Sequence, residues 1–374
     1  MARIVRAGEA SSEAERRNEG STKCVRNPGK REFAMQTRDE KCIAFLAFFA
    51  KQKATLKRKF KTRHLSYYFN GYEAFMRKLK DLNYGIVGLG IMGGSIAKAI
   101  RQNILSQNGA TGKIFACNRS TACLSQAKSE GVVDQTFTSD QVQNMIVDCD
   151  ILYVCLYPHA TLDFLKNYKQ FFKPNSIVTD ISGVKGIFSK ELPDILRDDV
   201  DFIIGHPMAG GEKEGYANSN AAFFVNHNYI LCPEKFNKSE NIELMKQFIT
   251  EIGFSRITET TCDIHDYKIG FTSQLCHVIA SALVESAQDS EITAFGGGSF
   301  EDLTRIAMIN APLWTELFIS NKEKLCQHID NFQNMMTEFK NAIEKEDAEK
   351  LKSLLEDTRD KRLKMGSIRT VKKD

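Results

Sequence analysis

The stretch Gly88-Leu89-Gly90-Ile91-Met92-Gly93 decides the fold of this 374-residue chain. It follows a short apolar segment, residues 84–87, and leads into a segment with helical character, residues 95–102. In a strand–turn–helix unit of this kind, the first glycine permits a tight turn and the second lets the backbone approach a pyrophosphate. The third lets helix and strand pack closely. Because the unpaired N–H groups at the start of the helix face the phosphates, the stretch predicts a dinucleotide site.

Strand and helix patterns alternate from this stretch as far as residue 258. The apolar run 151–156 is typical of a parallel strand buried on both faces. Further strands are predicted at 113–117, 176–181, 202–205, 228–232 and 255–257, and further helices at 120–129, 159–172, 187–196 and 241–252. The alternation indicates a doubly wound α/β domain over residues 83–258.

Beyond about residue 260 the sequence predicts helices alone, in a domain over residues 259–374. Helices are expected at 265–287 and 299–309, and the chain restarts as a helix at Asn310-Ala311-Pro312, where proline suits the first turn. One helix carries an apolar stripe with alternating spacings of four and three: Leu325, Ile329, Phe332, Met336, Phe339 and Ile343. The stripe indicates either a core seam within the chain or a dimer interface, and its spacing leaves both open.

The composition excludes several classes of protein. The chain is 42% hydrophobic and 26% charged, which is typical of a soluble globular protein. Its longest apolar run, residues 42–50, is far shorter than the roughly 20 residues needed to span a bilayer. Residues 1–82 hold 20 Lys and Arg against 9 Asp and Glu, whereas the remaining 292 residues hold 31 against 38. An acidic main body argues against a nucleic-acid partner, and no membrane partner is expected.

Residues 1–82 are predicted to form a basic, disordered leader, since they mix charged and small polar residues without period. A start at Met76 is the alternative. The ten cysteines include no Cys-x-x-Cys pair, so no metal or redox motif is predicted. Several cysteines lie inside apolar runs and are interpreted as core residues with reduced thiols, which favours a cytoplasmic location.

The end of the second predicted strand bears on the choice of cofactor. An acid there favours NAD, whereas a nearby arginine favours NADP. Here the strand is followed by Asn118-Arg119-Ser120, without an acid. The guanidinium of Arg119 and the hydroxyl of Ser120 suit a 2′-phosphate. We expect NADP to be slightly favoured, and NAD stays open because Asn118 can still bond a ribose hydroxyl.

Polar side chains gather where the predicted strands end, the edge at which open parallel sheets bind ligands. His206 ends a buried strand, and an imidazole in that position suits acid–base chemistry. His159 and Asp180 also follow strands, but they are interpreted as helix-start and turn residues.

The helical segment carries a second polar group. Ser273 and His277 are four residues apart and share one helix face. Asp302 and Arg305 are three apart, close enough to pair, and arginine is suited to a bidentate grip on a carboxylate. The glycine loop at residues 296–298 would let the backbone approach a ligand.

In order and spacing, six stretches of the chain resemble the prephenate dehydrogenase family. They are Gly88–Ser95, Asp180–Lys185, Gly205–Gly210, His265-Asp266, Gly296–Ala307 and Asn310–Trp314. The resemblance covers residues 83 to about 362. It implies a Rossmann-type domain joined to an all-helical dimerisation domain, in a homodimer. It also implies oxidative decarboxylation of prephenate to 4-hydroxyphenylpyruvate and carbon dioxide, with hydride passing to NAD or NADP, in tyrosine biosynthesis.

The resemblance also implies roles for single residues. His206 would accept a hydrogen bond from the ring hydroxyl and help to deprotonate it. Arg305 would hold a substrate carboxylate, with Asp302 orienting it, and His277 would contact the pyruvyl side chain. Glu212 would stand at the mouth of the cleft.

Three positions depart from the family pattern. The family often has Gly-Ser where this chain has Ser182-Gly183, so the catalytic hydroxyl is expected at Ser182, shifted by one residue, or lost. Gln274 and Cys276 stand where the family often has histidine and proline. Arogenate dehydrogenase and a non-catalytic nucleotide-binding regulator are the alternatives. A β-hydroxyacid dehydrogenase is disfavoured by the stretches at Gly205–Pro207 and Gly296–Arg305.

Overall fold

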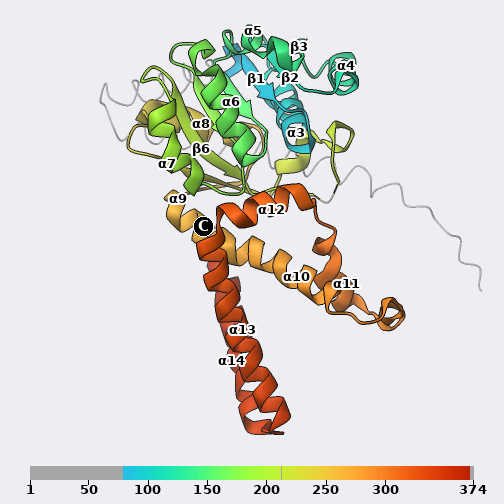
Figure 1. Cartoon of the computed structure of the whole chain (residues 1–374). Coiled ribbons are helices and arrows are strands. Elements are labelled where there is room, and N and C mark those ends of the chain that lie inside the picture. The colour runs from blue at the N-terminus through green and yellow to red at the C-terminus, as the bar shows by residue number, and fades with distance from the viewer. Residues whose placement is uncertain (1–78, 212, 371–374) are drawn as a thin grey trace, which may run out of the picture. The chain divides into compact units, whose positions relative to one another are not determined.

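The computed structural model of the protein describes residues 79–211 and 213–370 (Figure 1). Most of the predicted leader therefore lies outside the described residues. A short helical turn at residues 79–81 precedes the first strand, and Leu79 is buried in the core. The carbonyl of Leu79 accepts a hydrogen bond from the hydroxyl of Tyr84 at 2.6 Å. Packing of the sheet domain thus begins just before its first strand.

Eight strands form one sheet in the order β3-β2-β1-β4-β5-β6-β7-β8. The strands are β1 (Tyr84–Val87), β2 (Ile114–Cys117), β3 (Gln135–Phe137), β4 (Ile151–Val154), β5 (Ile177–Asp180), β6 (Asp201–Pro207), β7 (Asn228–Cys232) and β8 (Arg256–Glu259). Neighbouring strands are parallel except β6 and β7, which are antiparallel. The α/β sheet expected from the sequence is confirmed.

Helices cover both faces of the sheet. They are α3 (Ile91–Ala99), α4 (Thr121–Ser129), α5 (Val142–Ile146), α6 (Pro158–Tyr168), α7 (Gly186–Ile195) and α8 (Ser239–Glu251). Ile86 of β1 belongs to the core formed with α3 and α8, and its neighbour Val87 to the core formed with α6 and α7. Successive strand residues point to opposite faces, so both faces must be apolar.

The order of the strands creates a crevice next to the glycine stretch. β1 pairs with β2 on one side and with β4 on the other, so the order of connection reverses between β1 and β4. In open α/β sheets, ligands bind at such a reversal, outside the carboxyl ends of the strands. Gly88–Gly93 follows β1 and therefore lies at this point.

The segment after residue 260 is helical throughout its described part. It contains α9 (Cys262–Ile269), a π-helical turn η6 (Gly270–Gln274), α10 (Leu275–Glu285), a 3-10 turn η7 (Ser290–Phe295), α11 (Gly298–Thr304), a 3-10 turn η8 (Arg305–Ala307), α12 (Ala311–Ser320), α13 (Lys322–Glu344) and α14 (Ala348–Thr370). The predicted helix at 265–287 corresponds to α9, η6 and α10, which run on without a break. No described helix combines the length and the apolar character that crossing a membrane requires.

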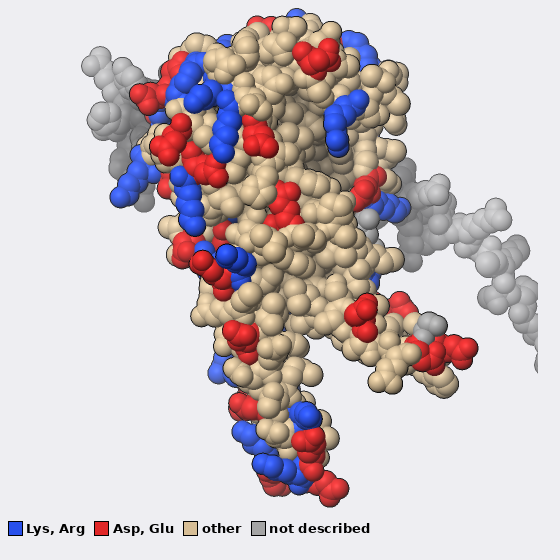
Figure 2. Space-filling view, viewed as in Figure 1, with Lys and Arg blue, Asp and Glu red and all other residues tan. Residues whose placement is uncertain are grey.

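α13 and α14 lie side by side as a long hairpin (Figure 1). Near the start of the apolar stripe on α13 Leu325 is buried, whereas Met336 and Ile343 further along are more than half exposed. On the face shown in Figure 2, charged side chains are spread over the sheet domain and gather again at the far end of the hairpin. The surface of α10 and α12 between them is mostly uncharged. The first part of the stripe therefore packs within the chain, and the later part stays open.

Candidate active site

A cavity of about 790 Å³ lies between the strand ends of the sheet domain and helices α9 to α12. Its lining brings together residues that the sequence predicted separately from both domains: Gly90, Ile91, Met92, Gly93, Ser182, His206, His277 and Arg305. Residues 206–211 and 213–215 form a further part of the wall. The predicted nucleotide turn, His206, His277 and Arg305 therefore meet in this cavity.

The glycine turn has the geometry that a dinucleotide requires. Gly88 has a φ of +94°, in the region that favours glycine. A Cβ atom on Gly93 would collide with the carbonyl oxygen of Gly88, whereas a Cβ on Gly90 would meet no atom within 4 Å. Helix α3 has no side-chain cap and no acid in its first turn. These residues fit a pyrophosphate, because backbone N–H groups and open space face the same cavity.

The residues predicted to contact the ribose lie outside the lining of this cavity. The Oδ1 atom of Asn118 accepts a hydrogen bond from the backbone N–H of Leu89 at 3.2 Å, which fixes the amide against the glycine turn. The Ser120 hydroxyl caps α4 by accepting from the N–H of Cys123. Arg119 is exposed and makes no ion pair with another described residue. Of the three, Arg119 is the side chain most available to a phosphate.

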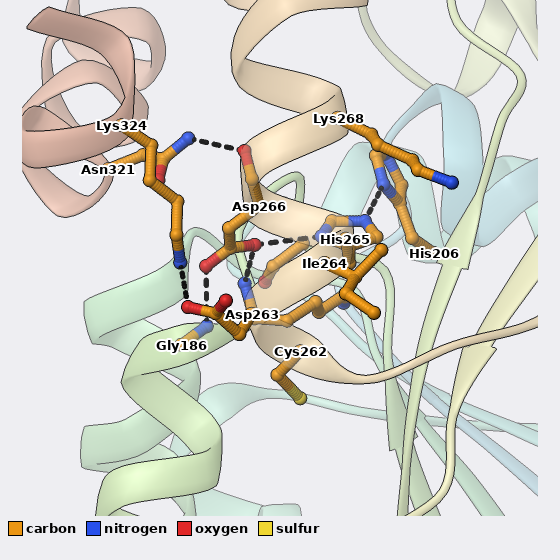
Figure 3. A network of polar contacts seen from close by, with 12 residues as sticks. Gly186, His206, Cys262, Asp263, Ile264, His265, Asp266, Lys268, Asn321 and Lys324 are labelled. Atoms are coloured by element: carbon orange, nitrogen blue, oxygen red, sulfur yellow. Dashed lines mark hydrogen bonds and ion pairs between the residues drawn. The ribbon is translucent and has the colours of Figure 1, made fainter. Parts of the chain in front are cut away.

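Two histidines and an aspartate form a chain of hydrogen bonds across the two domains (Figure 3). His206 Nδ1 lies 2.8 Å from His265 Nε2, and His265 Nδ1 lies 2.7 Å from Asp266 Oδ1. A carboxylate can only accept, so the Nδ1 atom of His265 carries the hydrogen and its Nε2 accepts from His206 Nδ1–H. The partners therefore assign the lone pair of His206 to Nε2, on the side of the ring away from His265.

Asp266 is held in place by the backbone of the sheet domain. Its carboxylate accepts hydrogen bonds from the N–H groups of Lys185 and Gly186, at 2.8 and 2.7 Å. Its own carbonyl accepts from Nδ2 of Asn321 at 2.9 Å. Several N–H donors stabilise the charged form of a carboxylate, so Asp266 is suited to orient His265.

A buried ion pair supports the strand ends beneath His206. Lys185 and Asp180 are both fully buried, and their charged groups lie 2.7 Å apart. The Lys185 ammonium also donates to the carbonyl of Gly205, and Asp180 accepts from the N–H of Gly205. Asp180 further accepts from the N–H of Ser182, consistent with the predicted turn role. A buried charge without its partner is strongly destabilising, so Lys185 and Asp180 stay paired. Their bonds to Gly205 therefore fix the backbone directly before His206.

Burial and charge keep the two histidines neutral. Burial lowers the pKa of His206 well below its ordinary value, and the nearby His265 and Lys185 lower it further. Burial likewise lowers the pKa of His265, although the hydrogen bond to Asp266 acts in the opposite direction. A neutral imidazole with an available lone pair is the form that can accept a proton.

His277 and Ser182 also line the cavity. His277 Nδ1 donates to the carbonyl of Ser273 at 2.9 Å, and the ring packs on Trp314 with 3.6 Å between centroids. Burial lowers the pKa of His277. The hydroxyl of Ser182 is buried and has no hydrogen-bond partner among the described residues. An unsatisfied hydroxyl beside a cavity is a group that a ligand can satisfy.

Two of the predicted substrate-binding residues are absent from the described wall. Asp302, on α11, is exposed and absent from the lining, and no ion pair between it and Arg305 occurs among the described contacts. Glu212 lies outside the described residues. Gln274 does line the cavity, but its amide donates to the carbonyl of Leu317 and accepts from Asn321. Gln274 therefore links η6 to α12 and to the start of α13.

Sequence reasoning missed the contribution of His265 and Asp266. Both lie in the middle of α9 and were identified only as part of a motif. Their 1% and 3% exposures are unusual for such polar residues. A histidine directly followed by an acid was the one available signal, and the sequence could not place it beside His206.

The fold and the glycine turn beside the cavity are those of a nucleotide-dependent dehydrogenase. Comparison with known families identifies the family of dehydrogenase to which the chain belongs. Residues 96–258 match the family model "Prephenate dehydrogenase, nucleotide-binding domain", and residues 261–357 match "Prephenate dehydrogenase, dimerization domain". The chain belongs to the prephenate dehydrogenase family, as its sequence motifs implied, and is an NAD(P)-dependent dehydrogenase of that family.

Individual relatives agree with this assignment. A solved structure of Aquifex aeolicus prephenate dehydrogenase, in complex with hydroxyphenyl propionate and NAD+, is 30% identical. The match covers 76% of this chain and 98% of that one, with a TM-score of 0.68. Prephenate dehydrogenase of Bacillus subtilis is 27% identical, with 74% of each chain covered. Cyclohexadienyl dehydrogenase of Zymomonas mobilis is 26% identical, over 77% of this chain and 97% of that protein.

Proposed function

We propose that this protein oxidises and decarboxylates prephenate to 4-hydroxyphenylpyruvate and carbon dioxide, with His206 as the base. The observation that carries the proposal is the His206–His265–Asp266 chain in a cavity shared with the glycine turn and Arg305. The bound nicotinamide supplies a hydride acceptor. The residues of the chain position the substrate, accept the proton of its hydroxyl and return it.

The proton steps follow from the assigned tautomers. His206 Nε2 accepts the proton of the ring hydroxyl while the carbon that bears it loses hydride. The bond to the ring carboxylate then breaks, carbon dioxide leaves, and the electron pair completes the aromatic ring. The proton returns from His206 to the phenolic oxygen, so His206 ends the cycle neutral. Asp266 stabilises positive charge on the histidines while the proton is held.

The substrate contacts complete the proposal. Arg305 binds one carboxylate, His277 contacts the pyruvyl side chain, and the Ser182 hydroxyl bonds the reacting end of the substrate. Asp302 and Glu212 are retained as residues that steer Arg305 and border the entrance. Because aromatisation supplies the driving force, positioning is the main task of these groups.

A direct assay tests the activity. The purified protein is given prephenate or arogenate with NAD or NADP, and formation of reduced nicotinamide is followed. We expect prephenate to be turned over faster than arogenate. Faster turnover of arogenate would assign the aminated substrate, and no turnover of either with either cofactor would favour the non-catalytic regulator.

NADP is the cofactor that we propose to be preferred, on the basis of Asn118-Arg119. Asn118→Asp should shift preference towards NAD by placing a charge against the 2′-phosphate. The fold should tolerate the change, because a carboxylate can accept the same Leu89 N–H. Arg119→Gln is the companion variant and should weaken NADP roughly tenfold while leaving NAD unchanged. A wild-type enzyme that uses NAD far better than NADP would contradict this assignment.

A homodimer in the cytoplasm is the form that we propose for the active protein. Support comes from the match of residues 261–357 to a dimerization domain and from the open end of the α13 stripe at Met336 and Ile343. Buried thiols such as Cys149 and Cys232, unpaired among the described cysteines, suit a reducing compartment. Sedimentation of the full chain should give twice the mass of one chain, and a monomer at all concentrations would refute the dimer.

A further inference from the structure

The loop between β6 and β7 forms one wall of the cavity, and its second half is anchored on α3. Tyr216 is buried, and a Cβ on Gly94 would lie 2.7 Å from both the Tyr216 ring and the Ser219 hydroxyl. The N–H of Asn220 donates to the Ser95 hydroxyl at 3.0 Å. The absence of a side chain at Gly94 therefore lets the loop lie directly on the helix.

The tip of the same loop is fixed to the helical domain. The Glu214 carboxylate accepts a hydrogen bond from Nδ2 of Asn310 at 2.5 Å, and Asn310 caps α12. The carbonyl of Glu214 accepts from Nδ2 of Asn218 at 2.6 Å. Lys213 directly precedes Glu214 in the chain and lines the cavity.

The charges of the cavity wall are few. Among the described lining residues the cations are Arg305 and Lys213, and the acid is Glu214, which is occupied by Asn310. Lys213 is exposed and makes no hydrogen bond or ion pair with another described residue. Its ammonium is therefore available to an anion that enters the cavity.

We propose that Lys213 binds the substrate carboxylate that Arg305 does not hold. This inference rests on the proposed function, because prephenate carries two carboxylates and each needs a counter-charge when it leaves water. An ammonium on a flexible stem suits this task, since it can follow a carboxylate without the fixed geometry of a guanidinium. Lys213 is thus a second determinant of specificity for dianionic substrates.

The test compares two lysines of the same domain. Lys213→Gln should raise the KM for prephenate roughly tenfold, the value of one charge-assisted contact at a partly exposed site. Lys235→Gln removes the same charge from an exposed position outside the lining and should leave the KM unchanged. Lys213→Arg should restore most of the lost affinity. An unchanged KM in Lys213→Gln would overturn the inference.

Two further measurements separate the sources of negative charge. The KM for the dinucleotide should stay constant in Lys213→Gln, and a rise confined to the dinucleotide would assign Lys213 to cofactor phosphates and overturn the inference. In the double variant Lys213→Gln, Arg305→Ala, the two effects on kcat/KM should multiply if the cations hold different carboxylates. A double variant no worse than Arg305→Ala alone would also overturn it. Failure of wild-type enzyme to oxidise prephenate would instead refute the proposed function.

Discussion

His206 and Arg305 face one cavity, but they have different chemical tasks that substitution should separate. His206 acts on the hydroxyl only as hydride leaves, so its contribution belongs to the transition state. His206→Asn should lower kcat on the order of 10²–10⁴-fold with little change in KM. Steady-state kinetics with prephenate give both constants, and a main effect on KM would count against His206 as the base.

Arg305 is proposed to grip a carboxylate that is present in both ground and transition states. Arg305→Ala should therefore act mainly on KM. We expect a rise of about 10- to 100-fold, since the contact is charge-assisted but Arg305 is exposed in the cavity wall. Cofactor affinity should survive, because Arg305 is not part of the Gly88–Gly93 turn. A wild-type KM in a folded Arg305→Ala protein would refute the assignment.

The pH dependence should report the neutral form of His206. The pKa of His206 is lowered, so protonation removes the base only on the acid side of its ordinary value, about 6.5. We expect kcat/KM to be constant from about pH 7 to 8 and to fall as the pH drops through the lowered pKa. The substrate carboxylates titrate near pH 4, so their protonation is the control for the acid side of the kcat/KM profile. A kcat/KM that rises between pH 7 and 8 would contradict a neutral resting histidine.

At this scale the sequence predicted the position of His206 but not its partner. A histidine at the end of a buried strand can be recognised from the sequence alone. His265 lies 59 residues further along the chain, on a helix of the other domain, so its hydrogen bond depends on the tertiary fold. The same limit explains Gln274, whose partners Leu317 and Asn321 come from α12 and the start of α13.

At the scale of the element, alanine substitutions at Gly90 and Gly93 should affect different properties, namely cofactor binding at Gly90 and stability at Gly93. Gly90 has a φ of −82°, which alanine adopts easily, and open space beside it. Gly90→Ala should fold normally yet bind the dinucleotide poorly, because the methyl group enters the space for the pyrophosphate. Dinucleotide titration measures this loss, and thermal unfolding provides the control.

Gly93→Ala should instead be a folding defect, since its methyl group would meet the Gly88 carbonyl in the turn itself. Overpacking of this kind costs roughly 1–3 kcal/mol. Denaturant unfolding should show the lower stability without added cofactor. Equal stability of the two variants would contradict the distinction.

Most strands and helices were predicted, including the four-residue strands β1 and β2, whereas β3 and α5 were not. β3 has three residues, none of them buried, and α5 has only five, so each is too short for its period to be recognised in the sequence. The π-helical turn at Gly270–Gln274 was predicted as ordinary helix, because it joins α9 to α10 without a break that the sequence would mark. Its place beside the cavity, with Ser273 in the lining, agrees with the frequent use of such turns at sites.

At the scale of the whole molecule, a chain beginning at Met76 should keep full activity. It retains Leu79, which is buried against the sheet domain, and every residue of the described cavity. Residues 1–82 differ in charge from the rest of the chain and supply none of the described lining. Turnover and sedimentation of the shortened and full chains give the comparison. A loss of turnover or of soluble dimer would show that the preceding residues are needed.

The hydrogen-bonded chain His206–His265–Asp266 limits how the two domains can be exchanged between related proteins. The base belongs to β6, but the group that sets its tautomer comes from α9, and Asp266 in turn is held by the N–H groups of α7. A chimera that joins this sheet domain to a helical domain without the His-Asp pair would therefore lack the partners that orient His206. The two domains can therefore be exchanged between proteins without loss of the oriented base only when the incoming helix carries the same His-Asp pair at the positions of His265 and Asp266.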